Sequence, residues 1–226
     1  MAKINVSYGE VDTDVMVAQI NKVSKMYPPQ FPWDKLAVEW PELTSDSVVV
    51  EIGGYTGTWS LRMSEFYNPR LFVFEPQEWC CIILKELLSG KNATVYQFGL
   101  GTETGSFPVY SSYPDYYEND GCSFVEFLDE GINRTNMKAT LPMREIGKEF
   151  KDIGLNHIDL MHMNIEGGEY ELIPHMFEQN IFPEIFLLQS HSVLLDKEET
   201  LTKYLSKYYT VIWDYGTVAL SAYRLK

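Results

Sequence analysis

The 226-residue chain carries 18 Lys and Arg residues against 32 Asp and Glu residues, and this net charge of -14 would repel a nucleic-acid backbone over most of the surface. The three cysteines, Cys80, Cys81 and Cys122, show neither a CxxC pair nor a Cys/His spacing, which argues against a disulfide framework and a structural zinc site. The length suits one α/β domain over residues 1–226, and since no apolar run reaches membrane-spanning length, we expect a cytoplasmic protein without membrane insertion.

The first 47 residues predict a helix followed by a proline-rich connector. Apolar residues recur at helical spacing over 13–27, behind a cap at Thr13 and Asp14, and the segment PPQFPW then stops the helix. We expect this region, 1–47, to pack on the main body of the domain.

From residue 48 onward, strands and helices alternate. The predicted strands cover 48–53, 71–75 and 94–98, and the predicted helices lie near 57–67 and 77–89. Alternation at this spacing indicates right-handed βαβ units, which build a parallel sheet.

Residues 99–137 interrupt this rhythm. The segment is rich in Tyr, Asp, Ser and Pro, and we interpret it as an insertion with short strands and an exposed loop. Long loops in compact domains are often functional, so this insertion is a candidate surface for binding a substrate.

The alternation resumes and continues to the C-terminus. Helices are predicted at 141–150, 167–180 and 196–208, and strands at 157–164, 184–191, 209–216 and 218–225. A Gly turn separates the last two strands, which we expect to pair antiparallel. The predicted fold is therefore α/β: a mostly parallel seven-stranded sheet with an antiparallel C-terminal edge hairpin and helices on both faces.

A glycine-rich turn follows the first parallel strand, in the segment VVVEIGGYTGTWSL. The turn at this place in an open parallel sheet usually contacts a ligand, and Gly53, Gly54 and Gly57 would let the backbone approach it closely. The dinucleotide pattern G-x-G-x-x-G fails because Ile52 or Tyr55 would stand where a glycine is required. A P-loop fails as well, since no Gly-Lys-Ser/Thr follows. An ordinary tight strand-to-helix turn is the structural alternative.

Two acids lie at the ends of neighbouring strands. Glu51 precedes the first glycine, where its carboxylate would repel a pyrophosphate and attract a ligand that carries an ammonium group. Glu75 stands where it could accept hydrogen bonds from two ribose hydroxyls, although a solvated strand-end acid is equally expected for this residue alone. Together the two acids favour a nucleoside that carries an amino acid, and S-adenosylmethionine (SAM) is that ligand.

Four segments resemble the FkbM-type branch of the class I SAM-dependent methyltransferases. VVVEIGGYTG resembles the family's first motif, usually D-x-G-A-N-x-G, and FVFEP resembles its second motif almost letter for letter. IDLMHMNIEGGEYELI resembles its most characteristic segment, L-K-I-D-x-E-G-x-E, and EIFLLQSH resembles the strand that follows. The resemblance implies a Rossmann-like class I methyltransferase fold and methylation of hydroxyl groups, often on sugars.

The resemblance also implies a SAM site. The methionine end of SAM would be surrounded by residues of the first motif: Glu51, Gly53, Gly54, Tyr55 and Gly57. Glu75 would hold the ribose with Pro76 next to it, and Phe98 and Gly99, at the end of the third strand, would lie near the adenine.

This chain departs from the family pattern at three positions. Tyr55 stands at the usual Asn, His162 at the usual Lys and Asn164 at the usual Asp. Asn164 matters most, because a strand-end Asp is the natural anchor for a divalent cation and Asn carries no charge. A requirement for a divalent metal is therefore left open.

A sugar hydroxyl needs a general base before it attacks a methyl group. We predict His191 as this base, because an unperturbed imidazole titrates near neutral pH. Glu166 and Asn164 are predicted beside it, with Glu166 binding or orienting the acceptor. The alternatives are a strand-end histidine bonded to backbone for His191 and a first-turn helix acid for Glu166. Glu169 fits that helix role better than a catalytic one.

Two tyrosines of the insertion, Tyr116 and Tyr117, are predicted to bind the acceptor, because aromatic faces beside acids suit a sugar ring. A mobile polar loop whose tyrosines cover the domain is the alternative. His157 and His175 lie outside the predicted site, and we expect no role for them.

The leading hypothesis is a SAM-dependent O-methyltransferase that acts on a hydroxyl of a sugar or glycan. One alternative is a short oxidoreductase that binds NAD in the same crevice, and another is a non-catalytic SAM-fold module that scaffolds an assembly. The sequence identifies neither the acceptor nor the oligomeric state.

Overall fold

The computed structural model describes residues 3–6, 9–14, 16–18, 21, 40–111, 124, 128–129, 132–133, 136–191, 195–215 and 220–226. The chain forms two compact units, Met1–Phe98 and Gly99–Lys226, so the interpretation of 1–226 as one domain stays a prediction. No helix in the described part of the chain is both long and apolar enough to cross a membrane.

The N-terminus of the first unit forms a hairpin that the sequence did not predict. Strand β1 (Lys3–Val6) pairs antiparallel with β2 (Gly9–Asp12). The described residues between 13 and 21 are helical, as predicted. The rest of the predicted helix and the segment PPQFPW lie outside the described residues.

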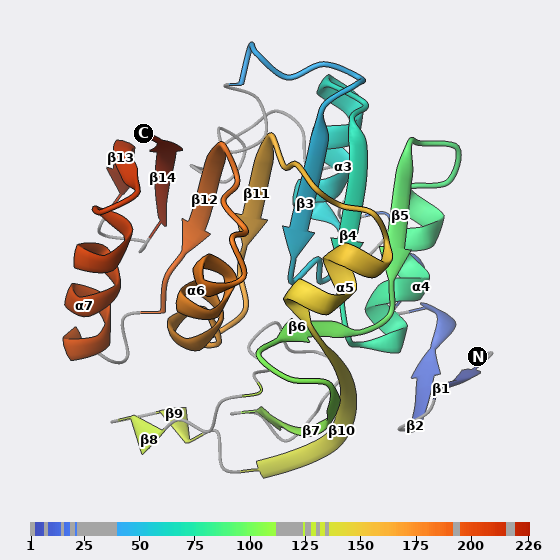
Figure 1. The fold of residues 1–226 in the computed structure, drawn as a ribbon. Helices are drawn as coiled ribbons and strands as arrows, with labels where there is room; N and C mark the ends of the chain where they lie inside the picture. Colours follow the sequence, from blue (N-terminus) through green and yellow to red (C-terminus); the bar gives the residue numbers. More distant parts are fainter. Residues whose placement is uncertain are drawn as a thin grey trace. The chain divides into compact units, whose positions relative to one another are not determined.

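Three parallel strands form the centre of the first unit. They lie in the order β3 (Val48–Ile52), β4 (Arg70–Phe74) and β5 (Ala93–Tyr96). Helices α3 (Thr58–Phe66) and α4 (Glu78–Leu87) connect them and contact β4 and β5, as Figure 1 shows. All five residues of β3, Glu51 included, are buried, as expected of a central parallel strand that is covered on both faces.

The second unit holds the remaining strands of the large sheet. Strands β11 (Leu160–Met163) and β12 (Ile185–Gln189) run parallel, whereas β14 (Leu220–Leu225) pairs antiparallel with β12, and their opposite directions are visible in Figure 1. Strand β13 (Tyr209–Tyr215) pairs antiparallel with β14 and completes the hairpin.

The seven strands belong to one mostly parallel sheet, in the order β13-β14-β12-β11-β3-β4-β5. The second unit adds helices α6 (Glu169–Glu178) and α7 (Leu195–Leu205), which contact each other. The predicted α/β fold, with its antiparallel C-terminal hairpin, is confirmed. Strands β11 and β12 are shorter than predicted: each begins later and ends earlier than the apolar pattern indicated.

A separate three-stranded sheet occupies much of the predicted insertion. Strand β10 (Asn136–Glu145) pairs parallel with β6 (Gly99–Gly101) and antiparallel with β7 (Gly105–Ser111). Two further short strands, β8 (Leu128–Asp129) and β9 (Ile132–Asn133), pair with each other. The predicted short strands are therefore present, whereas Tyr116 and Tyr117 lie outside the described residues.

The helix predicted at 141–150 begins later than expected. Residues 141–145 continue strand β10, because they pair with both β6 and β7, and only Ile146–Asp152 form helix α5. Pairing with two neighbouring strands thus overrides the local helical pattern.

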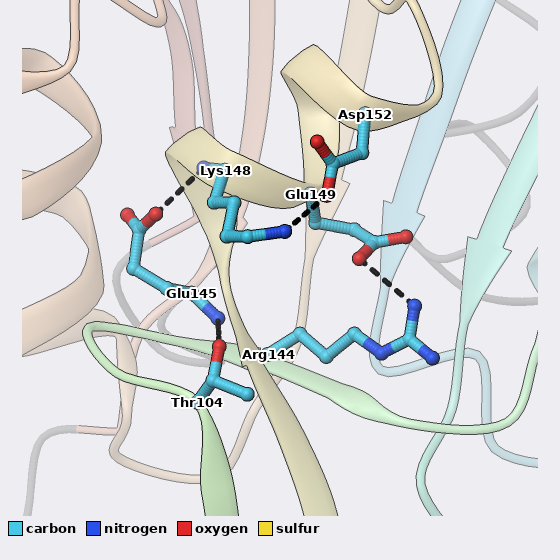
Figure 2. Close-up of polar contacts among 6 residues, drawn as sticks. All are labelled: Thr104, Arg144, Glu145, Lys148, Glu149 and Asp152. Carbon is cyan, nitrogen blue, oxygen red and sulfur yellow. Dashed lines mark hydrogen bonds and ion pairs between the residues drawn. The ribbon is translucent and has the colours of Figure 1, made fainter.

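Glu145 caps the N-terminus of α5. Its carboxylate accepts hydrogen bonds from the backbone amides of Gly147 at 2.9 Å and Lys148 at 2.6 Å, and its own amide donates to Thr104 Oγ1 at 3.0 Å. Figure 2 shows the capping bond to Lys148 and the bond to Thr104. His175, in the last turn of α6, lies 2.6 Å from Glu145 Oε1 through Nε2. One carboxylate therefore joins the start of α5 to the end of α6.

Two ion pairs flank this cap in Figure 2. Arg144 contacts Glu149 at 3.0 Å, and Lys148 pairs with Asp152 one helical turn away. Lys148 and Asp152 are both exposed, so solvent screens their attraction and the pair contributes little to stability.

We predict that Glu145→Ala destabilises the second unit through loss of the cap. Partial burial by itself raises the pKa of Glu145, but hydrogen bonds from His175 and from the amides of Lys148 and Gly147 outweigh it, so the pKa lies below its ordinary value. The substitution should cost about 1 kcal/mol near neutral pH. An acid with a lowered pKa stabilises the fold above its unfolded pKa of about 4.3, so the cost should shrink as the pH falls below about 4.

The measurement is denaturant unfolding of both proteins between pH 3 and pH 7. Asp152→Ala serves as a matched control on the same helix and should leave stability almost unchanged. If both substitutions lowered the free energy of unfolding equally, the cap would not contribute more to stability than an exposed ion pair does.

Candidate functional site

The turn after β3 depends on its glycines. Gly53 and Gly57 have φ angles of 86° and 84°, a region where a Cβ atom is strained. Gly54 has no such angle, but a Cβ there would lie 2.4 Å from Val73 Cγ1. The turn is therefore closely packed on β4, and the sequence prediction of a tight glycine turn after the first strand is consistent with this geometry.

Tyr55 is held in the left-handed region, with φ 43°. Its ring meets the ring of Trp79 edge-on, with centroids 5.7 Å apart, and its backbone amide donates to Glu75 Oε2 at 2.8 Å. Asn adopts this conformation more readily than a bulky residue does. This gives a physical reason for the Asn that the resembling family carries here, and it means that Tyr55 holds its position at some cost in strain.

Glu75 is buried at the end of β4, with 3% of its surface exposed. Its two carboxylate oxygens accept hydrogen bonds from the amides of Tyr55 and Gln77, both at 2.8 Å. Burial raises the pKa of Glu75 to about 7; the negative charge of Glu51 adds to this effect and the two backbone bonds oppose it. Each oxygen keeps a further lone pair, so the carboxylate could still accept hydrogen bonds from a ligand.

Glu51 is the second buried acid of this unit, with 2% of its surface exposed. It lies within β3, where Val73 of β4 is its partner in the ladder. Ser60 of α3 donates a hydrogen bond to Glu51 Oε2. Two acids buried close enough to influence each other would be stabilised by a cationic ligand, which matches the chemistry expected from the sequence.

The predicted adenine and ribose residues lie at the ends of β4 and β5. Phe98 is buried, and its ring centroid lies 5.7 Å from that of Phe74 and 5.6 Å from that of Tyr96. Pro76 follows Glu75 directly and is half-buried. Gly99 begins β6 and belongs to the second unit.

The second unit holds an acid–histidine cluster, made of Glu166, Glu169 and His191. His191 Nε2 lies 3.2 Å from Glu166 Oε1, and Nδ1 lies 3.1 Å from Glu169 Oε1. The side chains of His191 and Glu166 are 14% and 18% exposed, whereas that of Glu169 is fully buried. The structure thus brings Glu166 and His191 together, as the sequence analysis predicted, and adds Glu169.

Glu169 fixes the position of His191. Besides the contact with the ring, Glu169 accepts hydrogen bonds from the amide of His191 at 2.7 Å and from that of Gly167 at 2.8 Å. Tyr170 donates to the carbonyl oxygen of His191 at 2.7 Å. The first turn of α6 therefore holds the end of β12 through successive side chains.

The sequence analysis placed Glu169 only at the helix N-terminus. It is a first-turn acid, and it also orients the predicted base. One feature of the sequence could have indicated that Glu169 lies near Glu166: the two acids stand three residues apart at the start of a helix. The contact with His191 spans 22 positions, and only the packing of α6 against β12 reveals it.

The two carboxylates change the acid–base behaviour of His191. Burial by itself lowers the pKa of His191, but the hydrogen bonds with Glu166 and Glu169 and the charges of these acids outweigh it and raise the pKa to about 9. The imidazole therefore holds its proton at neutral pH, in contrast to the unperturbed value on which the sequence prediction rested.

Two carboxamides lie at the carboxyl ends of β11 and β12. Asn164 Oδ1 and Gln189 Oε1 are buried, and neither has a hydrogen-bond partner among the residues that the structure describes. His162, which stands two residues before Asn164, is also buried. A buried acceptor without a donor is costly, so these two oxygens are suited to bind a donor group of a ligand.

We predict that Gly57→Ala destabilises the first unit more than Gly90→Ala does. Both glycines have positive φ angles, 84° and 75°, so each substitution should cost about 1–2 kcal/mol of backbone strain. A Cβ at Gly57 would also lie 2.8 Å from Leu84 Cδ2, whereas nothing lies within 4 Å of one at Gly90. Overpacking should add roughly 1–3 kcal/mol at Gly57, and denaturant unfolding of the two variants measures the difference. Equal losses of unfolding free energy in the two variants would contradict the close packing of the turn against Leu84.

We predict that Glu169→Gln lowers the pKa of His191 from about 9 toward its ordinary value. The measurement is an NMR titration of the histidine ring protons, with the His191 signal identified as the one missing in His191→Asn. A histidine with a raised pKa stabilises the fold below its unfolded pKa of about 6.5, and this contribution is lost as the pH rises through about 9.

The wild-type protein should therefore lose more stability between pH 6.5 and pH 9 than Glu169→Gln does. Glu171→Gln, an exposed acid of the same helix turn, is the control and should titrate like the wild type. An unchanged pKa of His191 in Glu169→Gln would contradict the interaction of Glu169 with the His191 ring.

No family model and no curated protein sequence matches this chain. Among solved structures, it is similar to a candidate O-methyltransferase from Klebsiella pneumoniae, with a TM-score of 0.52 and 10% identity over 94% of this chain and 89% of that one. It is also similar to the methyltransferase PaMTH1 from Podospora anserina, bound to S-adenosylhomocysteine (SAH), with a TM-score of 0.51 and 10% identity over 100% of this chain and 90% of that one. At this identity the likeness shows the fold alone: the chain has a Rossmann-like methyltransferase fold, as predicted.

Proposed function

We propose that the protein is a SAM-dependent O-methyltransferase that acts on a hydroxyl of a sugar, glycan or related metabolite. The observation that carries the proposal is the pair of buried acids, Glu51 and Glu75, around a glycine turn within a methyltransferase fold. The resemblance of four segments to the FkbM-type family supports the hydroxyl acceptor and the sugar class.

The residues of the first unit suit the cofactor. Glu75 would accept hydrogen bonds from the ribose hydroxyls, and the turn that contains Gly53 and Gly54 would let the backbone approach the methionine end. Glu51 adds negative charge near a ligand that carries a sulfonium and an ammonium group. When bound, SAM supplies an activated methyl group, so the protein's main task is to align an oxygen atom with it.

The residues of the second unit suit the acceptor. Ligands of open α/β sheets bind beyond the carboxyl ends of the strands, which is where β11 and β12 carry their polar side chains. The buried oxygens of Asn164 and Gln189 would accept hydrogen bonds from acceptor hydroxyls. Glu166 would orient the reacting hydroxyl.

In this proposal, His191 accepts the hydroxyl proton at Nε2, while Nδ1 keeps its own proton and donates a hydrogen bond to Glu169. The base must be neutral to act, and its pKa of about 9 leaves few neutral molecules at pH 7. The methylation rate should therefore rise nearly tenfold per pH unit below pH 9, provided that proton removal limits the rate.

We predict that SAH binds the protein and that Glu75→Gln weakens its affinity about tenfold to a hundredfold, since a hydrogen bond to a charged group is lost. The pKa of Glu75 is about 7, so the affinity of the wild type should rise between pH 6 and pH 8 as the carboxylate ionises. Isothermal titration calorimetry measures both effects. Glu86→Gln, an exposed acid of α4, is the matched control and should bind SAH like the wild type.

Thermal-shift and activity measurements separate the alternative functions. Stabilisation by NAD but not by SAM or SAH would favour the oxidoreductase and overturn the proposal. Binding of SAM without methyl transfer to any of a panel of sugar acceptors, read as methyl-group gain by mass spectrometry, would favour the scaffold module. Activity in chelator tests the role of a divalent metal, for which Asn164 offers no charge.

A further inference from the structure

We propose that His157, Asp159 and Glu184 form a binding site for a divalent metal of the zinc type. The three residues belong to the second unit, and within the described residues they are the set of His, Cys, Asp and Glu side chains whose ligand atoms gather within 4.8 Å of one another. This inference does not depend on the proposed methyltransferase activity.

The distances within this metal cluster suit one ion between three ligands. His157 Nε2 lies 3.1 Å from Asp159 Oδ1 and 3.8 Å from Glu184 Oε1. Ligands of a tetrahedral zinc ion, at about 2.0–2.2 Å from the metal, are separated by about 3.3 Å. The observed separations lie on either side of this value, so an ion could enter with small side-chain rotations.

Backbone pairing brings the three residues together. The amide of Glu184 donates to the carbonyl of Ile158 at 3.0 Å, and that of Ile185 donates to the carbonyl of Asp159 at 3.0 Å. The carbonyl of Glu184 accepts from Leu225 at 2.9 Å, which adds β14 to the same ladder. Asp159 and Glu184 therefore lie directly before the first residues of β11 and β12 and are held by backbone hydrogen bonds, and His157 lies two residues before Asp159.

The donor set selects the kind of metal. Two carboxylates attract a cation, and one imidazole favours zinc and similar transition metals over calcium and magnesium, which prefer oxygen ligands. Three protein ligands leave a fourth position for water. The side chains of His157 and Glu184 are 57% and 59% exposed, so an ion can reach them from solvent.

The metal cluster is distinct from the acid–histidine cluster. It lies at the amino ends of β11 and β12, whereas Glu166 and His191 follow the carboxyl ends of the same strands. Strand β11 spans four residues, so at about 3.3 Å per residue its ends lie on the order of 13 Å apart. The proposed ion would hold the edges of two strands together and would take no part in the chemistry at the other end.

We predict that the wild-type protein, without an affinity tag, binds one Zn²⁺ per chain in isothermal titration calorimetry and unfolds at a higher temperature with Zn²⁺ present. His157→Ala and Glu184→Gln should each weaken zinc binding at least tenfold, because each removes one of three ligands. The matched control is Glu199→Gln, an acid of α7 that is 73% exposed, and it should bind zinc like the wild type. Both substituted ligands are on the surface, and circular dichroism confirms that the variants fold.

Several outcomes would overturn the site. These are an absence of saturable zinc binding in the wild type, an unchanged affinity in His157→Ala, or equal affinities for Zn²⁺ and Mg²⁺ that indicate only diffuse attraction to surface acids. SAH titrations of the same variants should match the wild type. A loss of SAH binding in His157→Ala would contradict the separation of the two clusters, whereas failure of SAH binding in the wild type would concern the proposed function alone.

Discussion

Burial of the central parallel strands on both faces is the constraint on which the rest of this structure depends. Strands β3 and β11 are buried along their whole length, and β12 is buried except at its last residue. Such strands have little access to solvent for polar side chains except near their ends. Glu75 and His191 lie just beyond strand ends, where backbone amides and the first turn of α6 supply their partners.

The two units meet the cost of buried charge in different ways. In the first, Glu75 accepts hydrogen bonds from two backbone amides, but burial and the charge of Glu51 still raise its pKa to about 7. In the second, Glu169 is fully buried and stays paired with His191, whose pKa rises to about 9. One cluster is thus suited to receive a cationic ligand, and the other is suited to hold and release a proton.

Much of the fold could be predicted because its signals are local. Apolar runs separated by helical patterns are sufficient to indicate the parallel sheet, and the Gly turn is sufficient to indicate the C-terminal hairpin. The boundaries were less predictable. Residues 141–145 carry a helical pattern yet form part of β10, because 141–143 pair with β7 and 143–145 pair with β6, strands that lie much earlier in the sequence. The N-terminal hairpin was missed for a different reason: its two strands are neighbours in sequence, but each has only four residues, too few for a clear pattern.

The sequence by itself determined the alternating α/β architecture, the glycine turn and the acids Glu51 and Glu75, because spacing along the chain encodes each of them. Only the tertiary structure decided the environment of these groups. It placed Glu169 against His191 across 22 positions, reversed the expected neutrality of that histidine, and gathered His157 and Glu184 at one end of two paired strands. Contacts and pKa values depend on distances between residues that are far apart in sequence, and local sequence patterns do not determine those distances.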